Sequence, residues 1–305
     1  MCYSSLVDRA LKKAAARHRA KINIDAFVDL YAMGAKDPSL EIPLAMDAGA
    51  IDIGGMAGKS IEKYIRDMRG TQLAEQQQLL EDVHAELAEI ERQLGIKVLK
   101  KYEKDLGVKN RKRDRILQKI AKLTRQHTDD TYRIFPFYFA PVIIDNCGAR
   151  ELVPMRYRIL PRTGVEVPTQ YNVFNARRDS LQSARNWKPL FGQKHAIFPF
   201  YQFYEWVERD GRKLELSFSP DGFADMWAAS LYEETKTEHG LIRSFAMVTD
   251  EPPPEVAAAG HDRCPVFLRE DLIGDWLRPT GKALGELDAL LEHKQPTYYS
   301  HKLAA

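Results

Sequence analysis

The sequence predicts an α+β protein that is mostly β, with a few helices and one long helical hairpin. From residue 131 onward, short aromatic and β-branched runs such as "YRIFPFYFAPVIID" and "LVPMRYRILP" are broken by Pro and turn residues, as in strands. Between residues 60 and 127 the apolar residues recur at helical spacing instead. No long β-α-β alternation occurs, which argues against a doubly wound parallel sheet.

The first 60 residues predict little regular structure beyond one or two short helices. Residues 1–35 are assigned to those helices because "IDAFVDLYAMGA" carries apolar residues at helical spacing. Residues 36–60 are rich in Gly, Pro and Ala, and we expect them to be irregular.

The segment 60–127 predicts a hairpin of two helices. Six apolar residues follow one another at spacings of seven, three, four, three and four, which forms an a/d seam: Leu73, Leu80, Val83, Leu87, Ile90 and Leu94. A second helix, "KNRKRDRILQKIAKLTRQ", follows Gly107. The first helix is acidic and the second is strongly basic. Either the two halves attract each other, or the basic helix is an arm that contacts nucleic-acid phosphates, and both can hold together.

After residue 131 the further strand candidates are "LELSFS", "FADMWAAS", "FAMVT" and "CPVFL", each bounded by turn residues. One segment in this region, "NARRDSLQSARNWKPLF", is predicted to be helical.

Composition limits the possible functions. The chain has 305 residues, 44% of them apolar, which is enough for one large domain or two smaller ones. The net charge of +2 creates no whole-protein field, so that any nucleic-acid affinity must come from local patches. The three cysteines, Cys2, Cys147 and Cys264, form no CxxC pair, which argues against disulfides and a zinc site. With no long apolar run and no apolar signal core, the sequence predicts a soluble cytoplasmic protein.

Three polar positions stand beside apolar runs. Asn175 follows "YNVF", Glu205 lies between two aromatic residues in "FYEW", and His261 precedes the strand candidate "CPVFL". Each has an ordinary structural explanation: Asn175 as a helix N-cap, Glu205 as a solvent-facing strand residue, and His261 as a turn residue. The aromatic neighbours of Glu205 indicate a partly desolvated carboxylate instead.

Together these residues resemble the motifs of a known family. "NAR", "FYEW" and "HDRCPV", in this order and spacing on a chain that begins Met-Cys, are similar to the SOS-response-associated peptidase (SRAP) family, whose members crosslink themselves to abasic sites in single-stranded DNA. "LVPMRYRILP" is similar to the family's Met-Arg-Trp-Gly-Leu-Ile-Pro segment. The chain departs from the family at Tyr3 and Ser4, where the family has Gly and Arg, and at Cys264, where it has Met. Tyr157 and Arg158 replace Trp and Gly.

The resemblance implies a domain organisation. It covers residues 1–35 and 131–305, for which it implies an antiparallel, barrel-like sheet with flanking helices. Residues 36–130 then form an insertion that contains the helical hairpin. The insertion could dimerise, extend a DNA groove or dock a replication protein, and the sequence does not choose among these.

The resemblance also implies a catalytic set of Cys2, Asn175, Glu205 and His261. Once Met1 is removed, by the protein itself or by a cellular aminopeptidase, Cys2 carries an α-amine and a thiol on adjacent carbons. The amine can attack the aldehyde of a ring-opened abasic site to give a Schiff base, and the thiol can then close a thiazolidine ring. His261 would shuttle protons and help to reverse the crosslink, Glu205 would act on the sugar hydroxyls and the leaving water, and Asn175 would hold the amine or the sugar.

The predicted partner is single-stranded DNA that contains abasic sites, so that the protein would be nucleoid-associated when bound, with no membrane partner, no cofactor and no metal. Arg177 would bind a phosphate beside the lesion. The other candidates for DNA contacts are Arg156, Arg158, Arg162 and Arg178 in a basic groove, and Tyr157 and Trp187 as stacking platforms, unless the two aromatic rings pack in the core. Two other functions stay open: a cysteine hydrolase that uses Cys2 with His261, and a non-catalytic scaffold that binds single strands.

Overall fold

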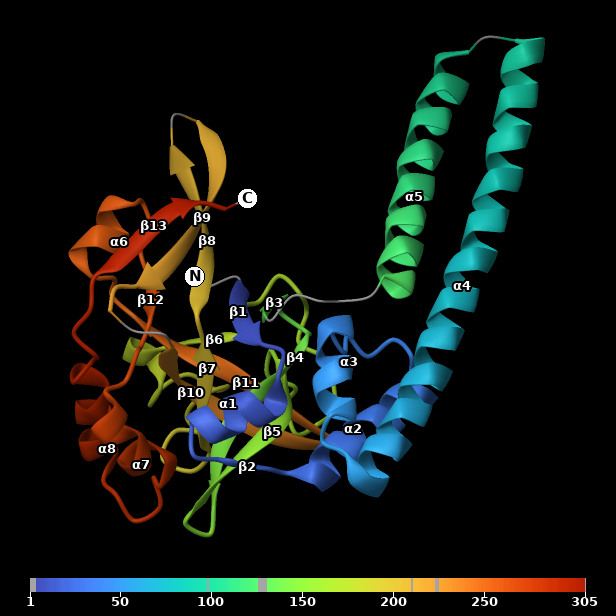
Figure 1. Cartoon of the computed structure of the whole chain (residues 1–305). Coiled ribbons are helices and arrows are strands. Elements are labelled where there is room, and N and C mark those ends of the chain that lie inside the picture. Colours follow the sequence, from blue (N-terminus) through green and yellow to red (C-terminus); the bar gives the residue numbers. More distant parts are fainter. Residues whose placement is uncertain (1–3, 98, 126–130, 210, 223–224, 305) are drawn as a thin grey trace.

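The computed structural model describes residues 4–97, 99–125, 131–209, 211–222 and 225–304. It has the α+β architecture that the sequence predicts: a β-rich body with flanking helices, and a long two-helix arm that projects from it (Figure 1).

The larger sheet has eight strands in the described chain and closes into a barrel. Its order is β12-β11-β10-β7-β4-β5-β2, β6 lies beside β11, and β11 also pairs with β5. Strands β11, β10, β7, β4 and β5 therefore form a closed ring, mostly antiparallel, in which only the β5–β11 pairing is parallel. The strands are β2 (Lys21–Ile22), β4 (Phe139–Asn146), β5 (Ala149–Tyr157), β6 (Asn175–Arg177), β7 (His195–Phe200), β10 (Met226–Thr237), β11 (Gly240–Asp250) and β12 (Cys264–Pro265).

A second, five-stranded sheet has the order β13-β9-β8-β1-β3 and is antiparallel throughout. Its strands are β1 (Ser4–Asp8), β3 (Thr131–Ile134), β8 (Gln202–Arg209), β9 (Arg212–Pro220) and β13 (Tyr299–Leu303). The two ends of the chain thus enter the same sheet. Because β1 lies between β3 and β8, the N-terminal segment and the region after residue 131 share one framework.

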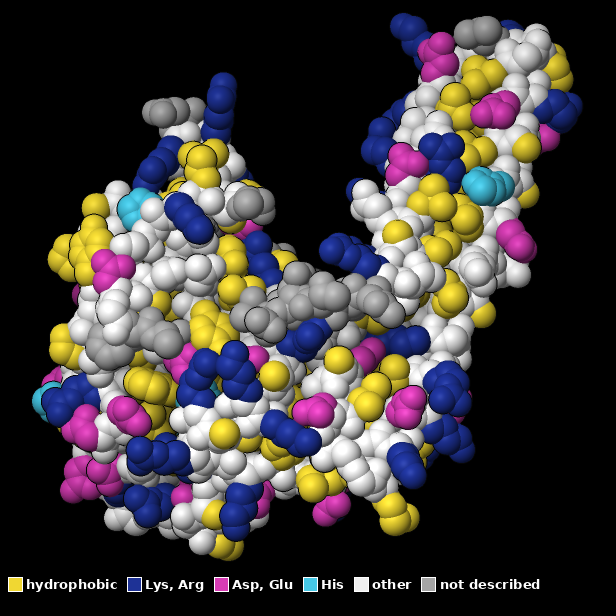
Figure 2. Space-filling model, viewed as in Figure 1, with side chains coloured by type: hydrophobic (Ala, Val, Ile, Leu, Met, Phe, Trp, Pro, Cys, Tyr) yellow, Lys and Arg dark blue, Asp and Glu magenta, His cyan; other side chains and the backbone are white. Residues whose placement is uncertain are grey.

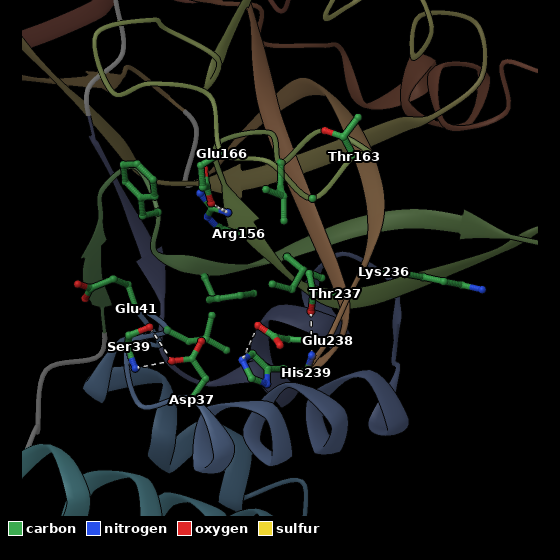
Figure 3. A pocket seen from close by; sticks show the side chains of 16 residues that line it. Asp37, Ser39, Glu41, Arg156, Thr163, Glu166, Lys236, Thr237, Glu238 and His239 are labelled. Carbon is green, nitrogen blue, oxygen red and sulfur yellow. Dashed lines mark hydrogen bonds and ion pairs between the residues drawn. The ribbon is translucent and has the colours of Figure 1, made fainter.

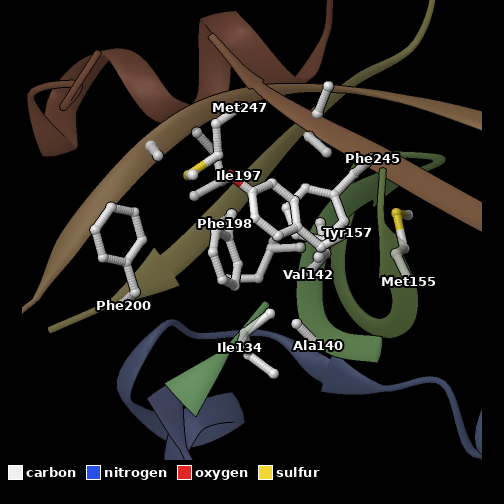
Figure 4. Packing of buried hydrophobic residues seen from close by; sticks show 14 of the residues in the cluster. Ile134, Ala140, Val142, Met155, Tyr157, Ile197, Phe198, Phe200, Phe245 and Met247 are labelled. Carbon is white, nitrogen blue, oxygen red and sulfur yellow. The ribbon is translucent and has the colours of Figure 1, made fainter. Parts of the chain in front are cut away.

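Aromatic and aliphatic side chains fill the barrel (Figure 4). The Tyr157 ring stacks on Phe245 with 5.1 Å between centroids and meets Phe174 edge-on at 5.5 Å. Phe198 packs against Phe245 at 4.8 Å. Each such side chain contributes about 1.5–3 kcal/mol when it is fully buried, so that this cluster holds the ring of strands together.

The helices flank the barrel or form the arm. They are α1 (Leu11–Arg17), α2 (Ile24–Lys36), α3 (Leu44–Ile51), α4 (Gly55–Ile96), α5 (Lys100–Thr124), α6 (Pro254–Ala258), α7 (Ile273–Leu277) and α8 (Leu284–Glu292). None of the helices in the described ranges is both long and apolar enough to cross a membrane.

The structure corrects three local predictions. Residues Ser4–Asp8 form a strand rather than part of a helix, because β3 and β8 hydrogen-bond to both of its edges. Residues 36–60 are not irregular throughout, since they contain α3 and the start of α4. The segment 175–191, predicted as a helix, is strand β6 followed by a single 3₁₀ turn (Arg178–Ser180) and further turns.

The predicted hairpin is present as α4 and α5, which contact each other along the arm (Figure 1). The first half of α4 packs on the body through Ile61 and Met68, and Arg69 binds Asp47 of α3 at 2.9 Å. The second half packs against α5 through a separate small core of Val83, Leu87 and Ile116. Helix α5 begins at Lys100, earlier than predicted, and passes through Gly107 without a break.

Candidate functional site

Glu205 is a buried carboxylate on β8. Side chains along a strand alternate between its two faces, and Phe203, Glu205 and Val207 all point to the buried side, whereas Trp206 is exposed. Glu205 retains only 2% of its accessible surface. Glu205 is therefore not the solvent-facing strand residue that its position could also have indicated. Burying a carboxylate costs free energy unless polar groups surround it.

His261 provides the polar contact. Its Nε2 lies 3.1 Å from Oε2 of Glu205, and both side chains are more than nine-tenths buried. The loop that carries His261 is held on β8 next to this contact, because Arg209 donates a hydrogen bond to the Ala259 carbonyl at 3.0 Å. Gly260 allows the chain to turn here with φ of +100°, a conformation that is strained for residues with side chains.

The 3.1 Å contact between Nε2 of His261 and Oε2 of Glu205 requires a proton between the two atoms. Nδ1 lies 2.8 Å from the Arg263 carbonyl, which can only accept, and 3.3 Å from the Arg263 amide nitrogen, which can only donate. With the ring proton on Nδ1, the Glu205 carboxyl donates to Nε2; with a proton on Nε2, Nε2 donates to the Glu205 carboxylate. In either form one proton is shared between Glu205 and His261. The pair can therefore give a proton to a reacting group or take one from it.

Asn175 lies on β6, the strand that runs beside the end of β11. Asn175 is opposite Met247, and the other edge of β11 pairs with β12, which begins three residues after His261. The Tyr157 hydroxyl donates a hydrogen bond to Asn175 Oδ1 at 3.1 Å, which fixes the amide orientation. The structure thus brings Glu205 and His261 into contact and places Asn175 on the neighbouring strands.

Cys2, the predicted nucleophile, lies outside the described residues, as does Tyr3. The described chain begins with Ser4, which pairs with Tyr204, the residue before Glu205. Arg133 of β3 holds this start of the strand: its Nε donates to Ser4 Oγ at 2.7 Å, and its guanidinium lies 3.7 Å from the centroid of the Tyr204 ring. Glu215 binds the same guanidinium through both carboxylate oxygens.

The other two cysteines have different surroundings. Cys264 is buried, and burial raises the pKa of its thiol well above the ordinary value, so that it stays protonated near neutral pH. Cys147 is exposed in the turn between β4 and β5.

The adjacent arginines Arg177 and Arg178 differ in availability. Arg177 is half exposed next to Asn175 and pairs with Asp179 at 2.5 Å. Arg178 is three-quarters or more buried and binds three acids, Asp250, Asp288 and Glu292. Hydrogen bonds to Asp288 raise the pKa of Arg178. Arg177 remains a candidate phosphate ligand, whereas Arg178 fastens β6 to β11 and α8, which corrects its assignment to a DNA groove.

Arg156 and Arg158 are structural as well. Arg156 is buried, and its Nη1 lies 2.6 Å from Glu166. Arg158 is 1% exposed, and its guanidinium donates to the carbonyls of Val167, Pro168 and Tyr171, which closes the loop after β5. Arg158 is enclosed by the protein, and Arg156 borders the cavity described below, which includes neither Glu205 nor His261, so that their assignment as DNA ligands beside the site is corrected.

Arg162 is exposed and pairs with Glu233 of β10. In this part of the barrel Glu233 is opposite Ser244 of β11, five residues before Thr249, which pairs with β12. Five residues of strand correspond to about 16 Å, so that Arg162 lies toward the other end of β11 from the Glu205–His261 pair.

Tyr157 and Trp187 are core residues. Tyr157 is fully buried in the barrel, and Trp187 is 5% exposed within the same hydrophobic cluster. Stacking on an unpaired base requires an exposed ring face. The stacking role is therefore wrong for both, and core packing, the alternative left open by the sequence, describes them.

Two residues near the pair were not selected from the sequence. Trp206 follows Glu205 on β8 and is 48% exposed, a large aromatic side chain on the outer face of the strand. Arg263 lies two residues after His261, with Nη2 at 3.6 Å from Asp179, which also binds Arg177. Strand alternation would have found Trp206, because an inward Glu205 implies an outward neighbour.

A separate cavity of about 580 Å³ lies beside the turn that joins β10 to β11. Figure 3 shows the Arg156–Glu166 pair on one side of it and Asp37, Ser39 and Glu41 on another. This cavity does not include Glu205 or His261. The described residues contain no cluster of three or more His, Cys, Asp or Glu side chains arranged to hold a metal ion.

Comparison with known proteins identifies the family. The family model described as SOS response associated peptidase (SRAP) matches residues 104–303, about two thirds of the chain. The chain belongs to the SRAP family. The SRAP match begins within α5, so that it includes most of the second helix of the arm, whereas the sequence places the insertion at 36–130.

Curated relatives are similar at modest identity. The abasic site processing protein YobE of Bacillus subtilis (strain 168) is 26% identical over 162 residues, which cover 53% of this chain and 74% of the relative. The abasic site processing protein YoqW of Bacillus phage SPbeta is 25% identical over 163 residues, 53% of this chain and 73% of the relative.

Two solved structures resemble this SRAP chain more distantly. A protein from Bacteroides thetaiotaomicron aligns with a TM-score of 0.47 and 17% identity, over 57% of this chain and 78% of that one. A protein from Bordetella bronchiseptica aligns with a TM-score of 0.48 and 20% identity, over 59% and 90%.

Proposed function

We propose that this protein processes abasic sites in single-stranded DNA by forming a thiazolidine crosslink between Cys2 and the ring-opened sugar. The observation that carries the proposal is the buried Glu205–His261 pair beside the first described residues of the chain. Family membership supports it, and relatives at 25–26% identity carry the name abasic site processing protein.

The chain length between Cys2 and the pair is compatible with this chemistry. Ser4 pairs with Tyr204, the neighbour of Glu205, and only one residue separates Ser4 from Cys2. Ser4 thus lies beside the part of β8 that carries Glu205, and it is the first residue after Cys2 and Tyr3.

The reaction proceeds in two bond-forming steps once Met1 has been removed. The α-amine of Cys2 adds to the aldehyde carbon of the open sugar, and the carbinolamine loses water to give an imine. The thiol sulfur then adds to the imine carbon, the thiol proton passes to nitrogen, and a five-membered ring closes. Amine, aldehyde and thiol give thiazolidine and one water, with no oxidant or reductant. An internal cysteine cannot react in this way, because its nitrogen is an amide.

The pair supplies the proton transfers in these steps. Sugar opening and loss of water each need a donor, and ring opening of the thiazolidine during reversal needs one again. The proton shared by Glu205 and His261 is positioned for these roles, and the site is largely closed to bulk water. Asn175 contributes neutral hydrogen-bonding capacity, and Trp206 and Arg177 are exposed aromatic and cationic groups available to bases and phosphates.

The decisive experiment is intact-mass spectrometry after mixing the protein with a single-stranded oligonucleotide that contains one abasic site. We expect loss of Met1 and a gain equal to the oligonucleotide minus water, stable to heat and detergent. Cys2→Ala should abolish the adduct, because both reacting groups depend on a terminal cysteine. Cys147→Ala, which removes an exposed thiol elsewhere, is the matched control and should react normally.

Adduct formation by Cys2→Ala at the rate of the unaltered protein would contradict the proposal. Turnover of a peptide or amide that requires Cys2 and His261, with no DNA adduct, would favour the cysteine hydrolase. Binding of undamaged single strands that is insensitive to Cys2, Glu205 and His261 changes, again with no adduct, would favour the scaffold.

A further inference from the structure

Helix α5 carries a dense row of exposed cations. Seven Lys and Arg side chains from Lys101 to Lys122 are exposed, and we call them the α5 stripe: Lys101, Lys104, Arg111, Lys112, Arg115, Lys119 and Lys122. From Lys101 to Lys122 the helix rises by about 32 Å. At 100° per residue, the acidic residues Glu103 and Asp114 lie on another side of the helix, whereas the half-buried Asp105 lies at the edge of the stripe.

The stripe does not serve to hold the two helices of the arm together. Lys109 of α5 pairs with Glu86 of α4 and lies outside the stripe, and the apolar contact between the helices runs through Ile116, Val83 and Leu87. Among the described residues, no stripe side chain lies within 4 Å of a carboxylate. Like charges three or four residues apart repel one another, so that the stripe is destabilising until an anion approaches it.

Helix α5 stands across from the hairpin of β8 and β9 in space, although the two are far apart in sequence (Figure 1). Figure 2 shows the hollow between the arm and the body, with Lys and Arg side chains along the edge of the arm that borders it. On the side of the body, the tip of the hairpin carries the exposed residues Arg209, Arg212 and Lys213.

We propose that the arm is a second wall of the DNA-binding groove, in which the α5 stripe binds the phosphates of the single strand that flanks the lesion. This inference rests on the proposed function for the identity of the strand. Charge complementarity carries it: a row of exposed cations about 32 Å long borders the hollow between the arm and the body, across from the hairpin of β8, the strand that carries Glu205, while the whole chain has a net charge of only +2. The phosphate contact that the sequence predicts for a basic arm is thereby assigned to the α5 stripe.

The test uses the full-length protein with Lys112, Arg115 and Lys119 replaced by Gln, a good helix former that keeps the helix and removes three charges. A matched control carries Gln in place of Lys59, Lys63 and Arg66. These three cations are exposed on the first turns of α4, where that helix packs on the body. Circular dichroism verifies that both variants keep their helices. Fluorescence anisotropy then gives Kd for a labelled undamaged single strand of about 25 nucleotides across a salt series.

We expect the slope of log K against log salt to fall by up to about 2 in the stripe variant, because each phosphate contact on a single strand contributes about 0.7. The control variant should keep the original slope. Equal slopes in all three proteins, or an equal fall in both variants, would overturn the inference. If the stripe variant lost affinity for duplex DNA but bound the single strand as tightly as the unaltered protein, the inference would also be overturned.

Crosslinking separates this inference from the proposed function. An abasic oligonucleotide of about 5 nucleotides is too short to reach from the site along the stripe, so that the stripe variant should crosslink it at the normal rate, and only a long abasic strand should react more slowly at low concentration. If no protein forms an adduct with either oligonucleotide, the proposed function is wrong, and the salt slopes still decide whether the stripe binds single strands.

Discussion

At the scale of single residues, the candidate site depends on one unusual contact. Glu205 and His261 bury a carboxyl and an imidazole against each other at 3.1 Å, and Nδ1 of His261 contacts the backbone of Arg263. A pair of this kind is expensive to bury and is kept in proteins mainly where proton transfer or positioning needs it. The contact joins β8 of one sheet to the loop before β12 of the other, so that the two sheets must be packed before it exists.

Replacing the Glu205 carboxyl by an amide should slow the chemistry and spare DNA binding. Glu205→Gln keeps the shape but cannot share a proton with His261, and we expect single-turnover crosslinking to fall by about 10²- to 10⁴-fold. Quench-flow or gel kinetics with an abasic oligonucleotide measure this rate. Glu208→Gln, an exposed position on the same strand, is the control and should react normally. An unchanged rate in Glu205→Gln would remove the pair from the mechanism.

The arginines show why residue type alone did not identify the DNA contacts. Arg177 and Arg178 are neighbours in the sequence, yet Arg178 is surrounded by three acids from β11 and α8, while Arg177 stays half exposed. Arg156 and Arg158 point into the structure from alternate positions of one chain segment. The partners that decide these roles lie about 70 to 110 residues away for Arg178, beyond the reach of any local pattern.

At the scale of elements, strand β1 was the segment that local sequence misjudged. "SSLVD" is too short to show a clear period, and its neighbours in the chain are helical. Pairing with β3 and β8 makes it a strand, and Arg133 clamps it through Ser4, Tyr204 and Glu215.

Removing the clamp should disturb the position of the nucleophile more than DNA affinity. In Arg133→Met, Ser4 loses a hydrogen bond and Glu215 loses its cation, and we expect crosslinking to slow by about 10- to 100-fold, because small misplacements of reacting groups have effects of that size. Binding of an undamaged single strand should change less than twofold. Arg243→Met, which breaks a similarly exposed pair with Glu234 on the barrel, is the matched control. Equal rates in the two variants would contradict a positioning role for Arg133.

The arm was the element that the sequence predicted best. The a/d seam is a local signal, since residues three and four apart meet on one helix face, and the seam residues Val83 and Leu87 are buried against Ile116. Its boundaries were less accurate, because α4 extends back to Gly55 through a Gly- and Ala-rich segment that packs on α2 and α3.

At the scale of the whole molecule, a buried polar cluster ties the N-terminal segment to the barrel. His18, which follows α1, accepts a hydrogen bond at Nδ1 from the indole of Trp227 on β10 at 3.0 Å, and Arg17 pairs with Asp225. An indole can only donate, so that a second proton on the His18 ring would break this bond. Burial and, to a smaller extent, the charges of Arg17 and Arg150 lower the pKa of His18 to about 4.

Acid should therefore destabilise the fold through His18. The pKa of His18 is lower in the folded chain than in the unfolded one, so that the unfolded state binds the extra proton first as pH falls through 6.5 toward 4. Its contribution to the free energy of unfolding is complete above that window and decreases by about 2 kcal/mol between pH 7 and pH 5. Protonation of Asp225, whose pKa burial raises, acts in the opposite direction.

Urea unfolding of the unaltered protein and of His18→Gln at both pH values isolates this contribution. We expect the variant to lose less stability on acidification, by about 2 kcal/mol. His84→Gln, on the exposed surface of α4, should behave like the unaltered protein. Parallel pH dependence in all three proteins would show that His18 titrates normally.

The sequence by itself determined the α+β class, the strand-rich region after residue 131, the helical hairpin and the family, because alternation, helical period and short ordered motifs are all local in the chain. Tertiary structure alone decided that β1 is a strand, that Tyr157 and Trp187 are core residues, which arginines are locked by acids, and that the arm borders a hollow beside the body. Each of these depends on burial or on a partner distant in sequence, and both exist only after the two sheets and the arm have packed together.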